Sequence, residues 1–308
     1  MRKLILFILL ILFLPFIIVY CSPSEDTIEL KLNYGSDRVI RVKRVNGGSI
    51  DSIGLEEYIV GVLAGEMPIY FELEALKAQA VAARSYALKR MEYNKNNEYD
   101  VVDSIMNQVY LDRDYLKEVW GSSYTSNINK LIRAVNETSG EYLDYDGGIA
   151  DALFFSTSNG YTENSDVVFS FDVPYLKSVD SKWDESVSSV FHSSITISVS
   201  DFLQKMKISN SDKVVFSDIV KSDTGRVISI NINGVDFKGM DVYNNLGLKS
   251  LDFSLEQVGS NVVINTSGYG HGVGMSQYGA LGMAQEGYGY KDILKYYYSG
   301  TEIKKMEN

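Results

Sequence analysis

A run of apolar residues with the period of an α-helix occupies LEEYIVGVLAGEM, residues 55–67. Its apolar positions recur at i, i+3, i+4 and i+7 and are Leu55, Tyr58, Ile59 and Val62. The next position of the same stripe is Glu66. Burial on an apolar face and the negative end of a helix dipole both raise the pKa of a carboxyl group. Glu66 is therefore a candidate general acid. The alternative is a boundary residue that reaches water or pairs with Lys77 or Arg84.

The remaining pattern mixes helices with short strands. Residues 31–45 alternate like strands, and residues 72–93 read as a long helix whose stripe of small residues favours close packing at the centre of the fold. A further helix is expected over 126–140, and residues 194–240 are mostly short strands with turns. The pattern predicts an α+β fold, with central helices around the Glu66 segment, short and mostly antiparallel strands packed on them, and a strand-rich subdomain.

The N-terminus carries a long apolar run. Arg2 and Lys3 precede residues 4–21, a stretch of 18 residues that is apolar apart from Pro15 and its last two positions. As a helix it would be roughly 27 Å long, close to the thickness of a bilayer core. With basic residues before it, it predicts a single-pass cell-membrane anchor and an exported C-terminal body. A lipoprotein modified at Cys21 and a cleaved signal peptide are the alternatives. The expected divisions are an anchor at 1–21, a tether with leading strands at 22–45, and a catalytic region at 46–308 that holds the subdomain at about 194–240.

Charge and composition exclude several classes of function. The net charge of −11 argues against non-specific binding of nucleic acid, which depends on a basic surface. The chain has one cysteine and two histidines, His192 and His271, so it can form neither an internal disulfide nor a multi-cysteine metal site. The G-x-S-x-G elbow of serine hydrolases and the H-E-x-x-H motif of zinc peptidases are both absent from the sequence.

The glycine-rich segment GYGHGVGMSQYG places His271 among four glycines. Its spacing does not match phosphate-binding or dinucleotide-binding loops. Glycines let a ligand approach the backbone closely, so one interpretation is a functional loop that presents His271, Ser276 and Gln277. The other interpretation is a tight structural turn in which His271 satisfies backbone groups.

Five separated blocks of the sequence carry a family resemblance: EYIVGVLAGEMPIYFELEALKAQAVAARSYAL, NQVY, FFSTSNGYTEN, PYLKSVDSKWD and GYGHGVGMSQYGALGMAQEG. In this order they closely resemble the stage II sporulation protein D family. The resemblance implies a peptidoglycan lytic transglycosylase whose catalytic glutamate, in the family's E-M motif, is Glu66. It also implies an N-terminal membrane anchor and a role in septal peptidoglycan remodelling during sporulation engulfment, beside an amidase and membrane partners.

The implied chemistry needs one carboxyl group. A lytic transglycosylase protonates the glycosidic oxygen between N-acetylmuramic acid and N-acetylglucosamine. The same group then takes the proton of the muramyl C6 hydroxyl as the 1,6-anhydro ring closes, so Glu66 would act first as acid and then as base.

The matching blocks imply a set of residues that line the cleft and hold the substrate: Gln108, Tyr110, Ser158, His271, Ser276 and Gln277. Arg84 either meets a lactyl carboxylate or forms a buried ion pair, and Gln79 carries the same two alternatives. Some family members hold zinc through a His and Cys cluster, but Asn107 stands at the cysteine position here. We therefore expect no metal and no other cofactor.

Two other functions stay open at this stage. The family also includes amidase enhancers, so the chain could bind peptidoglycan or an amidase and stimulate it without catalysis. A hydrolytic muramidase would need a second carboxylate, such as Glu74 or Asp103, and would leave reducing ends in place of anhydro sugars.

Overall fold

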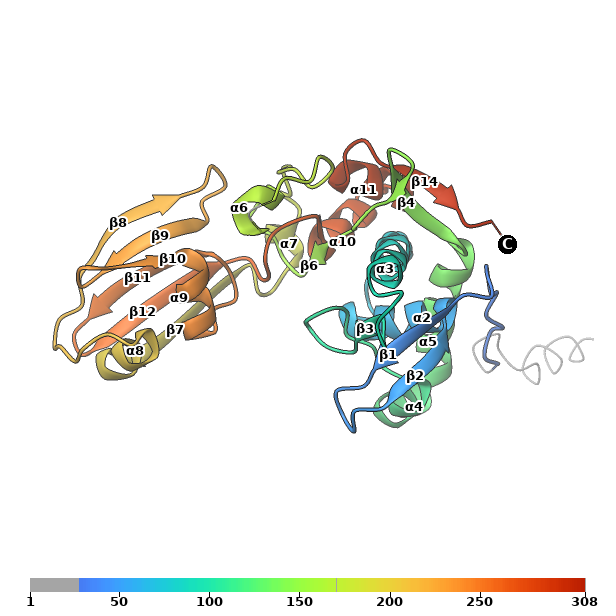
Figure 1. Cartoon of the computed structure of the whole chain (residues 1–308), viewed down its shortest axis with the longest axis horizontal. Helices are drawn as coiled ribbons and strands as arrows, with labels where there is room; N and C mark the ends of the chain where they lie inside the picture. Colours follow the sequence, from blue (N-terminus) through green and yellow to red (C-terminus); the bar gives the residue numbers. More distant parts are fainter. Residues whose placement is uncertain (1–27, 170, 308) are drawn as a thin grey trace, which may run out of the picture.

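The computed structural model describes residues 28–169 and 171–307, which form two lobes (Figure 1). The first lobe surrounds a long central helix, and the second consists of strands β7–β12 with two helices. The predicted anchor at 1–21 lies outside the described residues. Within the described ranges, no helix is both long enough and apolar enough to cross a membrane.

Helix α3 (Leu73–Tyr93) is the centre of the first lobe. Four helices pack against it: α2 (Leu55–Glu66), α5 (Tyr124–Glu137), α10 (Gln277–Gln285) and α11 (Tyr290–Tyr297). Its alanines from Ala75 to Ala87 are completely buried. Because these side chains end at Cβ, neighbouring helices approach α3 from several sides, as the stripe of small residues predicted.

Three small sheets and four short helical segments complete this lobe. The sheets have the orders β2-β1-β3, β14-β4-β5 and β13-β6, with β1–β3 and β13–β6 parallel and the other pairs antiparallel. Their strands are β1 (Val39–Lys43), β2 (Ile50–Gly54), β3 (Val101–Val102), β4 (Glu141–Tyr145), β5 (Gly148–Ile149), β6 (Phe154–Phe155), β13 (Met275–Ser276) and β14 (Glu302–Lys305). The short helices are α4 (Arg113–Trp120), η2 (Gly121–Ser123), α6 (Ser165–Phe169) and α7 (Asp184–Val187).

Helix α4 was not identified from the sequence. Its N-cap is Asp112, whose Oδ1 accepts a hydrogen bond from the Tyr115 N–H at 2.9 Å. Leu116 is its one buried residue, and an apolar stripe of only Leu116, Val119 and Trp120 over eight residues is a short signal in the sequence.

The second lobe has its own hydrophobic core, formed by residues between Val199 and Ile264. Two antiparallel sheets, β10-β9-β8 and β11-β12-β7, enclose it with helices α8 and α9. The elements are β7 (His192–Ser198), α8 (Val199–Met206), β8 (Phe216–Lys221), β9 (Val227–Ile232), β10 (Val235–Lys238), α9 (Gly239–Leu246), β11 (Asp252–Val258) and β12 (Asn261–Ser267). The β11–β12 hairpin thus packs with this core, beyond the boundary near residue 240 that the sequence predicted. The mixed α+β class is confirmed.

Candidate active site

A cavity of about 730 Å³ lies where the two lobes meet. The first lobe lines it with Glu66, Asn107, Val109 and Gln277. The glycine-rich loop contributes the segment 269–271, and the second lobe contributes α9 and the residues after it, from Tyr243 to Leu248. Among the described residues of this lining, Glu66 is the one carboxylic acid. The cavity therefore combines a single candidate acid with polar and aromatic groups.

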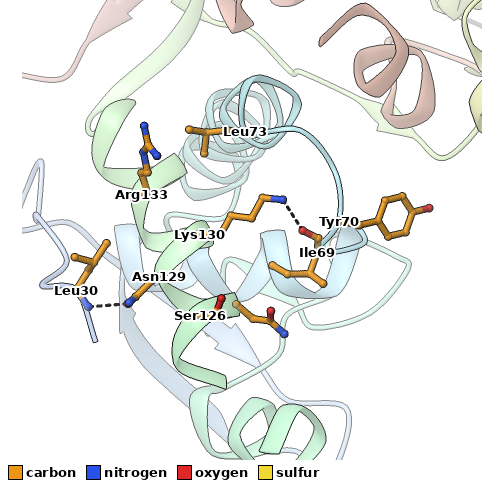
Figure 2. A pocket seen from close by; sticks show the side chains of 9 residues that line it. Leu30, Ile69, Tyr70, Leu73, Ser126, Asn129, Lys130 and Arg133 are labelled. Carbon is orange, nitrogen blue, oxygen red and sulfur yellow. Dashed lines mark hydrogen bonds between the residues drawn. The ribbon is translucent and has the colours of Figure 1, made fainter. Parts of the chain in front are cut away.

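A second cavity, of about 600 Å³, lies elsewhere on the first lobe (Figure 2). It lies beside Ile69 and Tyr70, with Lys130 donating a hydrogen bond from Nζ to the Ile69 carbonyl at 2.8 Å. Leu30 reaches it from the N-terminal segment, where the Leu30 N–H donates to Asn129 Oδ1 at 2.7 Å. The described residues of its lining include no carboxylic acid.

Two glycines of α2 bring the backbone around Val109 against the helix that ends in Glu66. A Cβ on Gly61 would lie 2.3 Å from Tyr110 Cε2, and a Cβ on Gly65 would lie 2.6 Å from the Val109 carbonyl oxygen. The bare helix surface also lets the Leu111 N–H donate to the Gly61 carbonyl at 3.2 Å. This close approach places the Val109 N–H 2.6 Å from Glu66 Oε1.

Glu66 occupies the last position of α2 and is partly buried. Burial raises the pKa of its carboxyl group, and the hydrogen bond from the Val109 N–H lowers it. The Gln277 amide also lowers it, although Gln277 Nε2 is buried without a hydrogen bond of good geometry. Burial is the larger effect, so the pKa is raised overall, in the direction that a general acid requires.

We predict that Gly65→Ala disrupts the setting of Glu66. The new methyl group would meet the Val109 carbonyl at 2.6 Å and Val109 Cγ1 at 2.9 Å, so the Val109 segment must move and its hydrogen bond to Glu66 must lengthen. Overpacking of this kind lowers the free energy of unfolding by about 1–3 kcal/mol. Urea denaturation would measure it. Gly148→Ala is the control, because its nearest neighbour would be 3.7 Å away. Equal stability of the two variants would contradict the prediction.

His271 lines the same cavity but has both ring nitrogens engaged. Its Nδ1 accepts from the Val273 N–H at 3.1 Å, and its Nε2 lies 3.1 Å from the Phe154 carbonyl. Since a carbonyl can only accept, the ring is neutral with its proton on Nε2. Burial lowers the pKa of His271 to about 4. The ring thus holds the glycine-rich loop against β6. Both interpretations of this loop apply in part, because His271 satisfies backbone groups and also lines the cavity.

Ser158 and Ser276 do not reach the cavity, which corrects their prediction as substrate contacts. Both are completely buried around the carboxylate of Asp184. The Ser276 hydroxyl donates to Asp184 Oδ1, and the Ser158 N–H donates to the same oxygen at 2.8 Å. Asp184 also accepts from the Ser181 hydroxyl at 2.7 Å. Asp184 thereby ties together the blocks FFSTSNG, VDSKWD and GMSQYG.

Gln108 and Tyr110 are also packing residues, contrary to their prediction as cleft residues. Gln108 is completely buried, with Oε1 accepting from the Tyr58 hydroxyl at 3.1 Å and Nε2 donating to the Ala83 carbonyl at 3.3 Å. The Tyr110 ring stacks on Tyr58 with centroids 5.4 Å apart, and Arg44 covers it at 5.0 Å. The Q-x-Y block therefore fixes the segment that carries Val109.

Arg84 is an internal ion-pair residue. It is completely buried, and its Nε and Nη2 donate to the two carboxylate oxygens of Glu56 at 3.0 and 2.6 Å. Its Nη1 donates to the Glu141 carbonyl at 2.9 Å, and the Gly140 N–H donates to Glu56 at 3.1 Å. The guanidinium has no exposed surface for a substrate, so of its two alternatives the structural one holds.

Gln79 is likewise completely buried on α3, outside the cavity lining. Its amide oxygen and nitrogen are without hydrogen-bond partners among the described residues. The position excludes direct contact with a ligand in the cavity, and nothing in the structure explains why a polar side chain stands there. Of the eight residues predicted to bind substrate, His271 and Gln277 are thus the two that line the cavity with Glu66.

Asn107 forms an internal bridge at the position where a resemblance to zinc-binding relatives would place a cysteine. Its Oδ1 accepts from the Val102 N–H and its Nδ2 donates to the Tyr86 hydroxyl, both at 2.9 Å. Both polar atoms of the Asn107 side chain are thus used to hold the loop. The residues present here do not fit the His and Cys cluster that would bind zinc. Within the described part of the chain, no group of three potential ligands is arranged to hold a metal ion.

A buried polar network that the sequence did not reveal joins the lobes behind the cavity. Arg226, directly before strand β9 of the second lobe, is 2% exposed and lies 3.8 Å from Glu163. Glu163 accepts from the Ser222 hydroxyl at 2.6 Å, and its own N–H donates to the Gly272 carbonyl at 2.7 Å. A Cβ on Gly272 would lie 2.6 Å from Arg226 Nε. The glycine-rich loop therefore lies directly on the guanidinium, which fixes the second lobe against the cavity.

Comparison with known proteins adds the relationships of the whole chain. Residues 44–145 match a family model described as stage II sporulation protein. Stage II sporulation protein D of Bacillus amyloliquefaciens is 42% identical over 274 residues, which is 87% of this chain and 79% of the relative. The protein of the same name in Bacillus subtilis is 42% identical over 273 residues, with the same coverage. An amidase enhancer of Bacillus subtilis is 31% identical over 79% of this chain and 40% of its own length.

Proposed function

This chain belongs to the stage II sporulation protein D family, and we propose that it is a peptidoglycan lytic transglycosylase with Glu66 as its single catalytic acid and base. The observation that carries the proposal is the position of Glu66. It is the one carboxylic acid among the described residues of the cavity between the lobes, and burial raises its pKa.

The proposed reaction uses Glu66 twice. Its protonated carboxyl group donates to the oxygen that links muramyl C1 to the next sugar, and this C–O bond breaks. The resulting carboxylate then accepts the proton of the muramyl C6 hydroxyl while the C6 oxygen bonds to C1. The Val109 N–H, 2.6 Å from Oε1, can stabilise the carboxylate between the two steps and orient the group.

A hydrolytic muramidase is less well supported, because the acids considered for the second role lie elsewhere. Glu74 pairs with Lys77 at 2.6 Å and accepts from the Tyr290 N–H at 2.9 Å. Asp103 pairs with Arg44 at 2.8 Å and accepts from the Val45 N–H at 2.6 Å. Both carboxylates are engaged outside the cavity lining, so neither is available to activate a water molecule there.

The alternative function is a non-catalytic enhancer, which the similarity to a protein named amidase enhancer favours. In that case the cavity would bind glycan or an amidase, and the raised pKa of Glu66 would have no consequence for turnover. We further propose that the protein acts in septal peptidoglycan remodelling during engulfment. Its membrane anchor at 1–21 and its amidase partner remain predictions.

The identity of the products decides among these functions. The purified full chain is incubated with glycan strands stripped of stem peptides, and the products are analysed by mass spectrometry. Anhydro-muramyl ends are the expected result, and reducing ends would support the muramidase. If no glycan product forms and the protein still raises the turnover of an added amidase, the enhancer reading holds and the proposed enzyme is wrong.

A further inference from the structure

The lining of the cavity around Glu66 continues along the second lobe. A neighbouring cavity of about 320 Å³ shares Gly247 and Leu248 with it, so the two meet at the C-terminal end of α9. The extension is lined by Ser193, Lys249 and Thr266, among others. Hydroxyl groups beside a cation suit a sugar that carries an acidic substituent.

Lys249 is held in place at the junction of the two cavities. Its carbonyl accepts from the Gly270 N–H at 2.8 Å, which fixes its backbone beside the glycine-rich loop. Its Nζ donates to the Ser193 hydroxyl at 3.2 Å and lies 5.7 Å from the centre of the Tyr269 ring. Tyr269 lines the larger cavity and Ser193 the smaller one, so the ammonium group lies between the two linings.

No acid is paired with Lys249 among the described residues, and it is the one lysine or arginine among those that line either cavity. The two buried arginines of the described residues are unavailable, because Arg84 binds Glu56 and Arg226 lies against Glu163. An unpaired cation in a cleft of a chain with net charge −11 is a selective contact for an anion.

We propose that Lys249, together with Ser193 and Tyr269, forms a carboxylate-binding subsite that takes the lactyl carboxylate of a muramyl residue. This subsite rests on the proposed function, since it assigns the same cleft a glycan strand. The ammonium group would pair with the carboxylate, the Ser193 hydroxyl would donate to it, and the exposed Tyr269 ring would cover the sugar. The subsite therefore selects strands whose lactyl groups are free.

The test measures binding to the full chain carrying Glu66→Gln, so that the ligand is not consumed. Two probes are compared by calorimetry: a peptide-free oligosaccharide of N-acetylglucosamine and N-acetylmuramic acid, and the same oligosaccharide with its carboxylates converted to methyl amides. The parent protein, which carries only Glu66→Gln, should bind the probe with free carboxylates more tightly than the methyl amide. Lys249→Met should weaken binding of the acid about tenfold and leave binding of the amide unchanged, because one charge-assisted contact is lost. Lys249→Arg should keep the preference.

Lys205→Met, on the exposed face of α8, is the matched control and should change neither affinity. Unchanged binding of the amide also shows that Lys249→Met is folded. Equal affinity of the parent for the two probes, including binding of neither, would overturn the subsite, as would an equal loss for both probes in Lys249→Met. If the preference depends on Lys249 while the wild type releases no anhydro product, the subsite stands and the proposed catalysis fails. If the wild type releases anhydro product but the preference does not depend on Lys249, the subsite is wrong and the proposed catalysis stands.

Discussion

Glu66→Gln is expected to lower the release of anhydro-muramyl products by about 10³-fold, the contribution of a positioned general acid and base. Glutamine has nearly the same shape and can still accept the Val109 N–H, so the cavity should keep its form. The amide has no acidic proton to give to the leaving oxygen and cannot take one from the C6 hydroxyl. Initial rates of product release, followed by chromatography, measure the effect.

Glu72→Gln is the matched control, since Glu72 is exposed at the start of α3 and should leave the rate unchanged. Full activity of Glu66→Gln would show that Glu66 is not the acid. Loss of activity together with lower stability would point to a structural role. For Glu66→Gln we expect no loss of stability at neutral pH, because the raised pKa of Glu66 means that its ionised form destabilises the fold.

The raised pKa of Glu66 predicts how rate and stability depend on pH. The first step needs the protonated carboxyl group, so the rate should fall as pH rises through a pKa above the ~4.3 of a free glutamate. A carboxyl group whose pKa is higher in the folded state stabilises the protein fully below the unfolded value and loses this contribution as pH rises through the folded value. At neutral pH, Glu66→Gln should therefore be at least as stable as the wild type. A rate that instead falls as pH rises through the free value of ~4.3 would contradict the raised pKa of Glu66.

Arg84→Met is expected to lower the free energy of unfolding by about 3–5 kcal/mol, because it leaves the Glu56 carboxylate buried without a partner. Glu56→Gln should have a loss of similar size, since the guanidinium then stays buried without its counter-charge. The pair joins α2, α3 and the Gly140 segment, so its removal loosens the helices that position Glu66. Urea denaturation measures the loss of stability. Assays of anhydro-muramyl product release under folded conditions measure the effect on the position of Glu66.

Arg133→Met provides the comparison, because the Arg133–Glu137 pair on α5 is largely exposed and should contribute less than about 1 kcal/mol. Arg84→Met combined with Glu56→Leu should recover part of the lost stability, since it removes both buried charges. A substrate-binding role for Arg84 predicts another pattern: unchanged stability, a raised KM, and no recovery in the double variant. That pattern would refute the buried-pair assignment.

The sequence by itself determined the helix that carries Glu66, the long helix α3 and the mixed α+β class. These depend on periodic burial and local propensity, which act over neighbouring residues and can therefore be inferred from the order of the amino acids. It also placed an acid at the last position of α2, where the structure has it. The motif blocks were recognised, yet the roles of most of their polar residues were not.

Only the tertiary structure decided which polar residues face the cavity and which hold the scaffold. Glu56 and Arg84 are 28 residues apart, and Ser276 and Asp184 are 92 apart. A buried serine or arginine and a ligand-binding one look alike in sequence, because the difference is the partner that folding brings to them. The same holds for Lys249, which is a candidate contact only because folding places it at the junction of the two cavities.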